Sequence, residues 1–200
     1  MPQDILAAYA EEADALIPSF EAISSADVLA PVMAWLPSTP RRIIDIGAGT
    51  GRDAAWLAAR GHTVLAVEPV AGFREAGMRL HAHPRIRWCE GTLPSLARIT
   101  ETGFDLILMV AAWHHIAPED RPPALRRLRQ LVSPDGRLLM SIRHGPAPPA
   151  RTGFASDAVA SSELAIQAGF SLLASRRVAS VSVANRAAGV TWTWLVLRAV

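Results

Sequence analysis

Gly47, Gly49 and Gly51 occupy every second position of a segment that follows an apolar run and precedes a helical one. Glycine lets the backbone take a positive φ and approach a ligand closely. A helix that begins behind such a loop presents free N–H groups and the positive end of its dipole. The three glycines therefore predict a binding site for a nucleotide-type ligand.

The spacing of the glycines bears on the kind of nucleotide. A dinucleotide fingerprint reads G-x-G-x-x-G, and its third glycine lets the helix pack closely beneath a pyrophosphate. Here the spacing is G-x-G-x-G, and Arg52 stands at the place of that third glycine. The loop therefore weighs against hydride transfer with a nicotinamide cofactor. An NAD(P)-dependent oxidoreductase is kept as a lesser alternative.

Glu68 ends the next apolar run, about twenty residues after the loop. A carboxylate at this place can accept hydrogen bonds from both hydroxyls of a ribose. Glu68 and the glycine loop together predict an adenosine ligand with a free ribose.

The elements that position these residues alternate along the chain. Short apolar runs typical of buried strands are separated by stretches with helical spacing, and Pro18 and Pro37 interrupt the N-terminal ones. Strands are expected at about 43–46, 62–67, 86–89, 104–110, 137–142, 170–178 and 190–198, and helices at about 4–16, 24–36, 53–60, 71–81, 118–131 and 157–167.

This alternation predicts an α/β fold with an open, doubly wound, mostly parallel sheet between two layers of helices. The segment 180–189 has no clear helix and joins the last two strands as a hairpin, which makes the final strand antiparallel. Trp192 and Trp194 alternate with threonines, so both indoles lie on one face, where we expect core packing rather than a ligand platform.

Composition limits the partners. The 200 residues suit a single domain over 1–200, and the 20 basic and 18 acidic residues nearly balance. All basic residues are arginines, and they form no basic stripe, so a nucleic-acid partner is not expected.

Cys89 is the only cysteine, which favours a reducing, cytoplasmic location. No apolar run reaches the ~18 residues of a membrane span. Neither a membrane nor a metal is expected, and the oligomeric state is not indicated.

Five segments together make the chain resemble the class I S-adenosylmethionine-dependent methyltransferases, in their small single-domain form. They occur in the family's order, and the resemblance covers about residues 40–200. It implies a Rossmann-like sheet of seven strands in the order 3-2-1-4-5-7-6, with strand 7 antiparallel. It also implies S-adenosylmethionine as cofactor and S-adenosylhomocysteine as product. The five segments are 44–51, 67–69, 90–94, 104–108 and 131–138.

The resemblance also implies cofactor-binding positions. The glycine loop would pass against the methionine part, Glu68 would bind the ribose, and the segment after the third strand would frame the adenine. Thr92 stands where many relatives have an aspartate, so it can accept only an uncharged hydrogen bond. Asp45 is expected to order the loop backbone. The complete set is Asp45, Gly47, Ala48, Gly49, Glu68, Pro69, Thr92, Leu93, Val110 and Ala111.

Methyl transfer requires alignment of the acceptor, and a base only where the acceptor must lose a proton. Ligand crevices of such sheets lie beyond the carboxyl ends of the strands. His114 and His144 follow two of these ends and are the weak candidates for a general base, and Trp113 could face the acceptor. His115 is expected to pack. Arg143 could meet an anionic acceptor, although pairing with a carboxylate on a neighbouring helix is the preferred interpretation.

The N-terminal helices, over 1–38, are expected to lie across the cofactor site. Tyr9 and Phe20 could then close over a sulfonium, since an aromatic face attracts a cation. Packing between the helices is the slightly favoured alternative for both side chains.

The sequence thus favours an S-adenosylmethionine-dependent methyltransferase with a small-molecule acceptor. A non-catalytic module that binds the same cofactor is the other alternative, supported by the missing aspartate at Thr92. No motif identifies the acceptor or the atom that is methylated.

Overall fold

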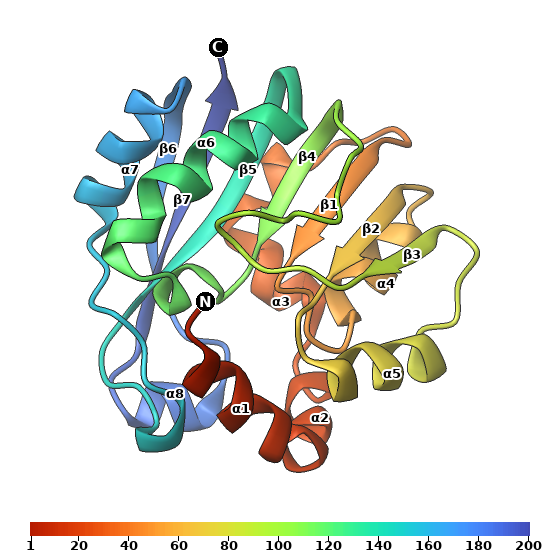
Figure 1. The fold of residues 1–200 in the computed structure, drawn as a ribbon, viewed down its shortest axis with the longest axis vertical. Helices are drawn as coiled ribbons and strands as arrows, with labels where there is room; N and C mark the ends of the chain where they lie inside the picture. Colours follow the sequence, from red (N-terminus) through yellow and green to blue (C-terminus); the bar gives the residue numbers. More distant parts are fainter.

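The computed structural model describes residues 1–200, apart from the side chain of Ala150. A sheet of seven strands runs through the middle of the molecule, with helices on both faces (Figure 1). The strands are β1 Arg42–Ile46, β2 Thr63–Val67, β3 Ile86–Cys89, β4 Phe104–Met109, β5 Val132–His144, β6 Phe170–Ala179 and β7 Thr191–Ala199. Their order is β3-β2-β1-β4-β5-β7-β6, and β7 runs antiparallel to both of its neighbours. The fold and strand order expected from the sequence are confirmed.

Helices of different lengths connect and cover the strands. The α-helices are α1 Gln3–Glu11, α2 Ala13–Glu21, α3 Ser25–Leu29, α4 Arg52–Ala58, α5 Ala71–Leu80, α6 Arg121–Leu131, α7 Ala158–Gln167 and α8 Val183–Ala187. The 3₁₀ helices are η1 Ala30–Trp35, η2 Trp113–His115, η3 Pro118–Asp120 and η4 Pro149–Arg151. No single helix of the described chain is long and apolar enough to cross a membrane, and α2 with the α3–η1 segment passes that test only as a bent pair.

Both faces of the sheet are buried, which explains the continuous apolar runs. Successive side chains of a strand point to opposite faces. Ile44 packs in one core cluster with Leu125 of α6, and Ile43 packs in the other with Leu57 of α4 and Leu29 of α3. Two helical layers thus hold the carboxyl ends of the parallel strands in fixed positions.

The N-terminal helix differs from the expected one over 4–16. The chain breaks at Glu12 between α1 and α2, and α2 continues past Pro18 to Glu21. Proline removes a helical hydrogen bond. Here the helix continues because its apolar face, including Phe20, packs against Phe73 of α5.

Three further boundaries differ. The helix expected over 24–36 divides into α3 and the 3₁₀ helix η1. The division falls next to Pro31, because proline has no N–H to donate to an α-helical hydrogen bond. The fifth strand begins earlier, at Val132, and the expected turn forms a bulge in which Asp135 takes a φ of 59°. The segment 180–189 contains the one-turn helix α8, whose start is capped by the Ser182 hydroxyl.

Candidate active site

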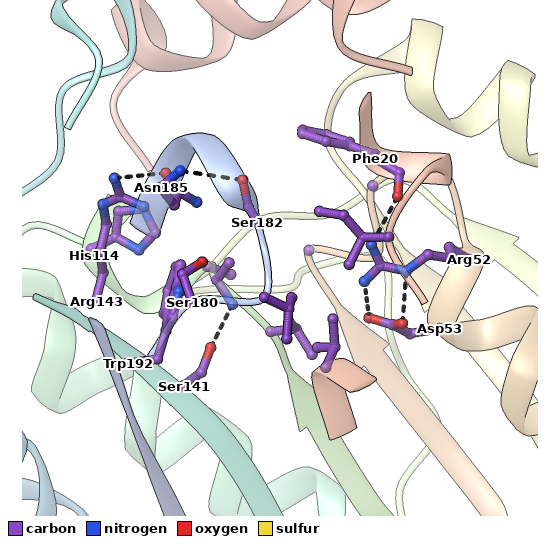
Figure 2. Close-up of a pocket in the computed structure, with 18 of the residues that line it drawn as sticks. Phe20, Arg52, Asp53, His114, Ser141, Arg143, Ser180, Ser182, Asn185 and Trp192 are labelled. Atoms are coloured by element: carbon purple, nitrogen blue, oxygen red, sulfur yellow. Dashed lines mark hydrogen bonds and ion pairs between the residues drawn. The ribbon is translucent and has the colours of Figure 1, made fainter. Parts of the chain in front are cut away.

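A cavity of about 720 Å³ lies beyond the carboxyl ends of the parallel strands. Its size is within the usual range of small-molecule pockets. Gly47 after β1, Glu68 after β2, Val110 after β4 and Arg143 near the end of β5 all line it. Figure 2 shows one end with His114, Arg143, Asn185 and Trp192, and the opposite end with Phe20, Arg52 and Asp53. Among the described residues, no group of three or more His, Cys, Asp and Glu could hold a metal ion.

The glycine loop forms one wall of the cavity. Gly47, Gly49 and Gly51 have φ angles of 74°, 56° and 78°, which only glycine adopts easily. The backbone N–H groups of Gly47 and Ala48 both donate to the Val67 carbonyl, at 2.8 and 3.1 Å. A Cβ on Gly47 would come within 2.9 Å of the Ala112 Cβ, so this position is also closed to a side chain.

Glu68 holds the loop from the neighbouring strand. Its Oε2 accepts a hydrogen bond from the Gly49 N–H and its Oε1 one from the Val70 N–H, each at 2.9 Å. The side chain is only 6% exposed. Burial raises the pKa of Glu68 to about 7, against the opposing effect of these two hydrogen bonds. Each oxygen retains a lone pair for a further donor.

Asp45 does not make the backbone contact that the sequence suggested. Its carboxylate is 2% exposed, and its Oδ2 has no hydrogen-bond partner among the described residues. Burial raises the pKa of Asp45, with a further contribution from Asp53. The loop backbone is ordered by Glu68 instead, and Asp45 lines the cavity with an unpaired oxygen.

Trp88 of β3 is a support for the loop that sequence reasoning missed. A Cβ on Gly51 would lie 2.6 Å from the indole ring of Trp88. One on Gly77 of α5 would lie 2.4 Å from the same ring and 2.6 Å from the Thr50 carbonyl. The indole fills the space left by these two glycines. In the sequence, the one sign of this packing was Gly77, a glycine in the middle of a helix.

The end of α2 is tied to the same loop. Glu21 accepts a hydrogen bond from the Thr50 hydroxyl and pairs with His81 Nε2 at 2.9 Å. The Arg52 guanidinium donates to the Phe20 carbonyl at 2.9 Å and is held by its neighbour Asp53. These contacts fix α2 over the glycine loop.

Tyr9 and Phe20 line the cavity and also pack between helices. Their ring centroids lie 6.1 and 5.4 Å from that of Phe73. The packing favoured from the sequence is therefore confirmed, and both rings are part of the cavity wall.

Replacing Glu21 by alanine is expected to release α2 from the loop. The change removes two side-chain contacts, each worth about 1 kcal/mol, so amide hydrogen exchange across α2 becomes faster while that of β4 and β5 is unchanged. The exposed Glu11 of α1 supplies the matched control, Glu11→Ala. Equal exchange rates in the two variants would show that Glu21 does not hold the helix.

His114 and His115, which belong to the 3₁₀ helix η2 after β4, line the cavity. His115 Nε2 lies 2.9 Å from the Tyr9 hydroxyl, and the His114 ring lies 4.0 Å from that of His115. Burial lowers the pKa of His115 to about 4 and that of His114 well below its usual value. Both rings are neutral near pH 7, and a base of such low pKa removes protons poorly.

Two other candidates lie away from the cavity. Trp113 is fully buried and its indole N–H donates to the Ser161 hydroxyl at 2.9 Å, so the suggestion that it faces an acceptor is wrong. His144 lines an adjoining pocket of about 390 Å³ that shares His114 and Arg143 with the cavity, and its Nε2 lies 2.8 Å from the Thr193 hydroxyl.

Arg143 does not pair with a carboxylate, which was the preferred interpretation of the sequence. No Asp or Glu among the described residues lies within ion-pair distance of it. Its Nη2 donates to the Pro146 carbonyl at 2.6 Å and lies 3.4 Å from the Asn185 Oδ1. The guanidinium lies 5.4 Å from the ring centroid of Trp192, which lines the cavity instead of being core.

The chain is similar in sequence to known methyltransferases. Residues 43–136 match the family model described as a methyltransferase domain. An uncharacterized methyltransferase of Mycobacterium bovis is 36% identical over 118 residues, which are 56% of this chain and 58% of that protein. A second one from this organism is 33% identical over 52% of this chain and 41% of its own length. The chain thus spans only about half the length of these relatives.

Solved structures share the fold. A TehB-like SAM-dependent methyltransferase from Corynebacterium glutamicum has a TM-score of 0.70 at 23% identity, with 96% of each chain covered. The Burkholderia thailandensis 1,6-didemethyltoxoflavin-N1-methyltransferase has a TM-score of 0.71 at 24% identity, covering 100% of this chain and 90% of its own. In sequence, residues 43–136 are thus similar to a methyltransferase domain, and the whole chain has the fold of SAM-dependent methyltransferases of known structure.

Most of the positions that the methyltransferase resemblance implied are brought together. Those that line the cavity are Asp45, Gly47, Ala48, Gly49, Glu68, Pro69, Val110 and Ala111. Thr92 and Leu93 do not line it: the Thr92 hydroxyl donates to the Leu93 carbonyl at 3.2 Å, and the Met1 amino group donates to the same oxygen at 2.8 Å.

Proposed function

We propose that this protein transfers a methyl group from S-adenosylmethionine to a small-molecule acceptor and releases S-adenosylhomocysteine. The observation that carries the proposal is one continuous cavity. The glycine loop and the buried Glu68 line one end of it, and the other end is lined by residues that the resemblance did not assign to the cofactor, such as Arg143 and Trp192. A single cavity of this size can hold an adenosyl ligand beside a second molecule.

The residues at the glycine-loop end fit the cofactor. Glu68 has a free lone pair on each oxygen for the two ribose hydroxyls. Asp45 has a buried oxygen without a partner, which suits an ammonium or a bound water. The positive φ and crowded Cβ position of Gly47 leave bare backbone facing the ligand. When bound, the cofactor supplies a methyl group already activated on a sulfonium.

The chain then has two tasks, which are orientation of the acceptor and exclusion of water. Tyr9 and Phe20 close the cavity from the N-terminal helices, and α2 is fixed there by Glu21. Holding the two reactants in line accelerates a transfer without covalent catalysis. Because His114 and His115 are neutral with lowered pKa values, we assign no general base.

A small acceptor is supported by the Burkholderia neighbour, whose structure holds 1,6-didemethyltoxoflavin together with S-adenosylhomocysteine. It is also supported by the lack of a basic stripe on this chain. A cytoplasmic location, a single domain over 1–200 and a cofactor site closed by the helices of 1–38 are parts of the same proposal.

Thermal-shift titration tests the cofactor, and product analysis tests the activity. S-adenosylhomocysteine is expected to raise the melting temperature progressively as its concentration exceeds its dissociation constant, while NAD and NADP leave it unchanged. Labelled S-adenosylmethionine with a panel of small acceptors is expected to yield a labelled product. Stabilisation by NAD alone would favour an oxidoreductase, and tight cofactor binding without any methylated product would favour a non-catalytic module.

A further inference from the structure

We infer that the acceptor is a planar small molecule with an anionic group, which Arg143 binds while the Trp192 indole stacks against the ring. The inference rests on the proposed function, since it names the acceptor class for the same cavity. Three features carry it: the distribution of charge around the cavity, the unfilled donors of Arg143 and the half-buried Trp192 indole beside that arginine.

Charge is divided between the ends of the cavity. The carboxylates that line it come from β1, the end of β2, α3 and α4, and are Asp45, Glu68, Asp27 and Asp53. The residues that η2, β5, α8 and β7 contribute include no acid within the described chain. A cationic sulfonium suits the first end, and an anion suits the second.

Arg143 is the half-buried cation at the second end that lacks an anionic partner. Arg176 lines the cavity without an ion pair as well, but it is exposed to water. Arg151 also lies there, but its Nε is 2.7 Å from the Glu12 carboxylate, and Arg52 at the other end is bound by Asp53. Burial lowers the pKa of Arg143, although the group stays charged near neutral pH. A charge that is partly removed from water without a counter-ion is costly, and a bound anion would offset this cost.

The guanidinium is held in place with donors to spare. Its Nη2 is fixed by Pro146 and Asn185, whereas its Nε is buried and has no partner among the described residues. Asn185 is in turn positioned by the cap that Ser182 forms on α8 (Figure 2). A planar guanidinium with free N–H groups matches the geometry of a carboxylate.

Trp192 provides the flat surface beside this cation. The indole is half-buried, lines the cavity, and lies 5.4 Å from the guanidinium and 5.9 Å from the His114 ring. Aromatic rings stack on such faces with substantial burial of area. A guanidinium next to an indole therefore favours an aromatic anion over an aliphatic or cationic acceptor.

Paired probes test this directly. 4-Hydroxybenzoate and 4-hydroxybenzamide, and likewise 1-naphthoate and 1-naphthamide, differ in charge but hardly in shape. Calorimetric titration of the protein, with and without saturating S-adenosylhomocysteine, is expected to show about 10- to 100-fold tighter binding of each carboxylate. Arg143→Gln is expected to abolish this preference, while Arg126→Gln, at an exposed position of α6, keeps it. Trp192→Leu is expected to weaken both members of each pair equally.

The outcomes separate the two proposals. Equal binding of carboxylate and amide by the wild type, or an undiminished preference in a folded Arg143→Gln variant, would overturn the anionic acceptor. Failure of S-adenosylhomocysteine to bind the wild type would overturn the proposed function instead. The titrations without it still report whether the cavity prefers the anion.

Discussion

Substitution of Glu68 by glutamine is expected to weaken S-adenosylhomocysteine binding by about 10- to 100-fold at pH 8. The ionised carboxylate can accept a hydrogen bond from each ribose hydroxyl while it retains those from Gly49 and Val70. A glutamine amide nitrogen cannot accept, so the variant loses either the Gly49 or the Val70 contact, and it cannot accept from the ribose hydroxyl on that side. Calorimetric titration of both proteins measures the difference.

The pH dependence has a definite sign. Since the pKa of Glu68 is about 7 without ligand, the carboxyl is largely protonated at pH 6 and ionised at pH 8. Cofactor affinity is therefore expected to rise from pH 6 to pH 8 in the wild type and to vary less in Glu68→Gln. In the ligand-free protein, the folded state keeps a proton that an unfolded glutamate loses near pH 4.5, so the contribution of Glu68 to stability falls between about pH 4.5 and 7.

The exposed Glu75 of α5 offers a matched control, because Glu75→Gln makes the same chemical change outside the cavity. This variant is expected to bind S-adenosylhomocysteine as the wild type does, with the same rise between pH 6 and pH 8. A Glu68→Gln protein with wild-type affinity at pH 8 would exclude Glu68 from ribose recognition.

Gly77→Ala is expected to destabilise the protein by about 1–3 kcal/mol, the usual cost of overpacking. In an ordinary helix interior the same change stabilises by about 1 kcal/mol. Here the new Cβ would meet the Trp88 ring at 2.4 Å and the Thr50 carbonyl at 2.6 Å. Urea unfolding and the melting temperature measure the loss, about 2–4 °C per kcal/mol for a chain of this size.

The next helical position provides the control. Met78 is 47% exposed, so Met78→Ala is expected to change stability by no more than about 0.5 kcal/mol. A double-mutant cycle with Trp88→Val identifies the clash, because the penalty of Gly77→Ala is expected to shrink once the indole is removed. A stabilised Gly77→Ala protein would show that Trp88 does not occupy this space.

The sequence by itself determined the order of elements and the glycine-loop end of the site. The spacing of apolar residues over a few positions predicts buried strands and helices, and prolines and glycines predict where these elements end. Alternation of strands and helices then limits the sheet to few topologies. Glu68 and the glycine loop could be paired from the sequence because adjacent parallel strands place their carboxyl ends side by side.

The tertiary structure alone decided the other end of the cavity and the supports beneath the loop. Arg143 and Trp192 are 49 residues apart, and they meet because β7 inserts antiparallel beside β5, where their backbones pair directly. Trp88 reaches both Gly51 and Gly77 through packing between separate elements. Spacing along the chain reports local periodicity, whereas such contacts depend on strand register and on which side chain fills a space. The contacts of Arg143 with Trp192 and of Trp88 with the two glycines could therefore be found only in the folded molecule.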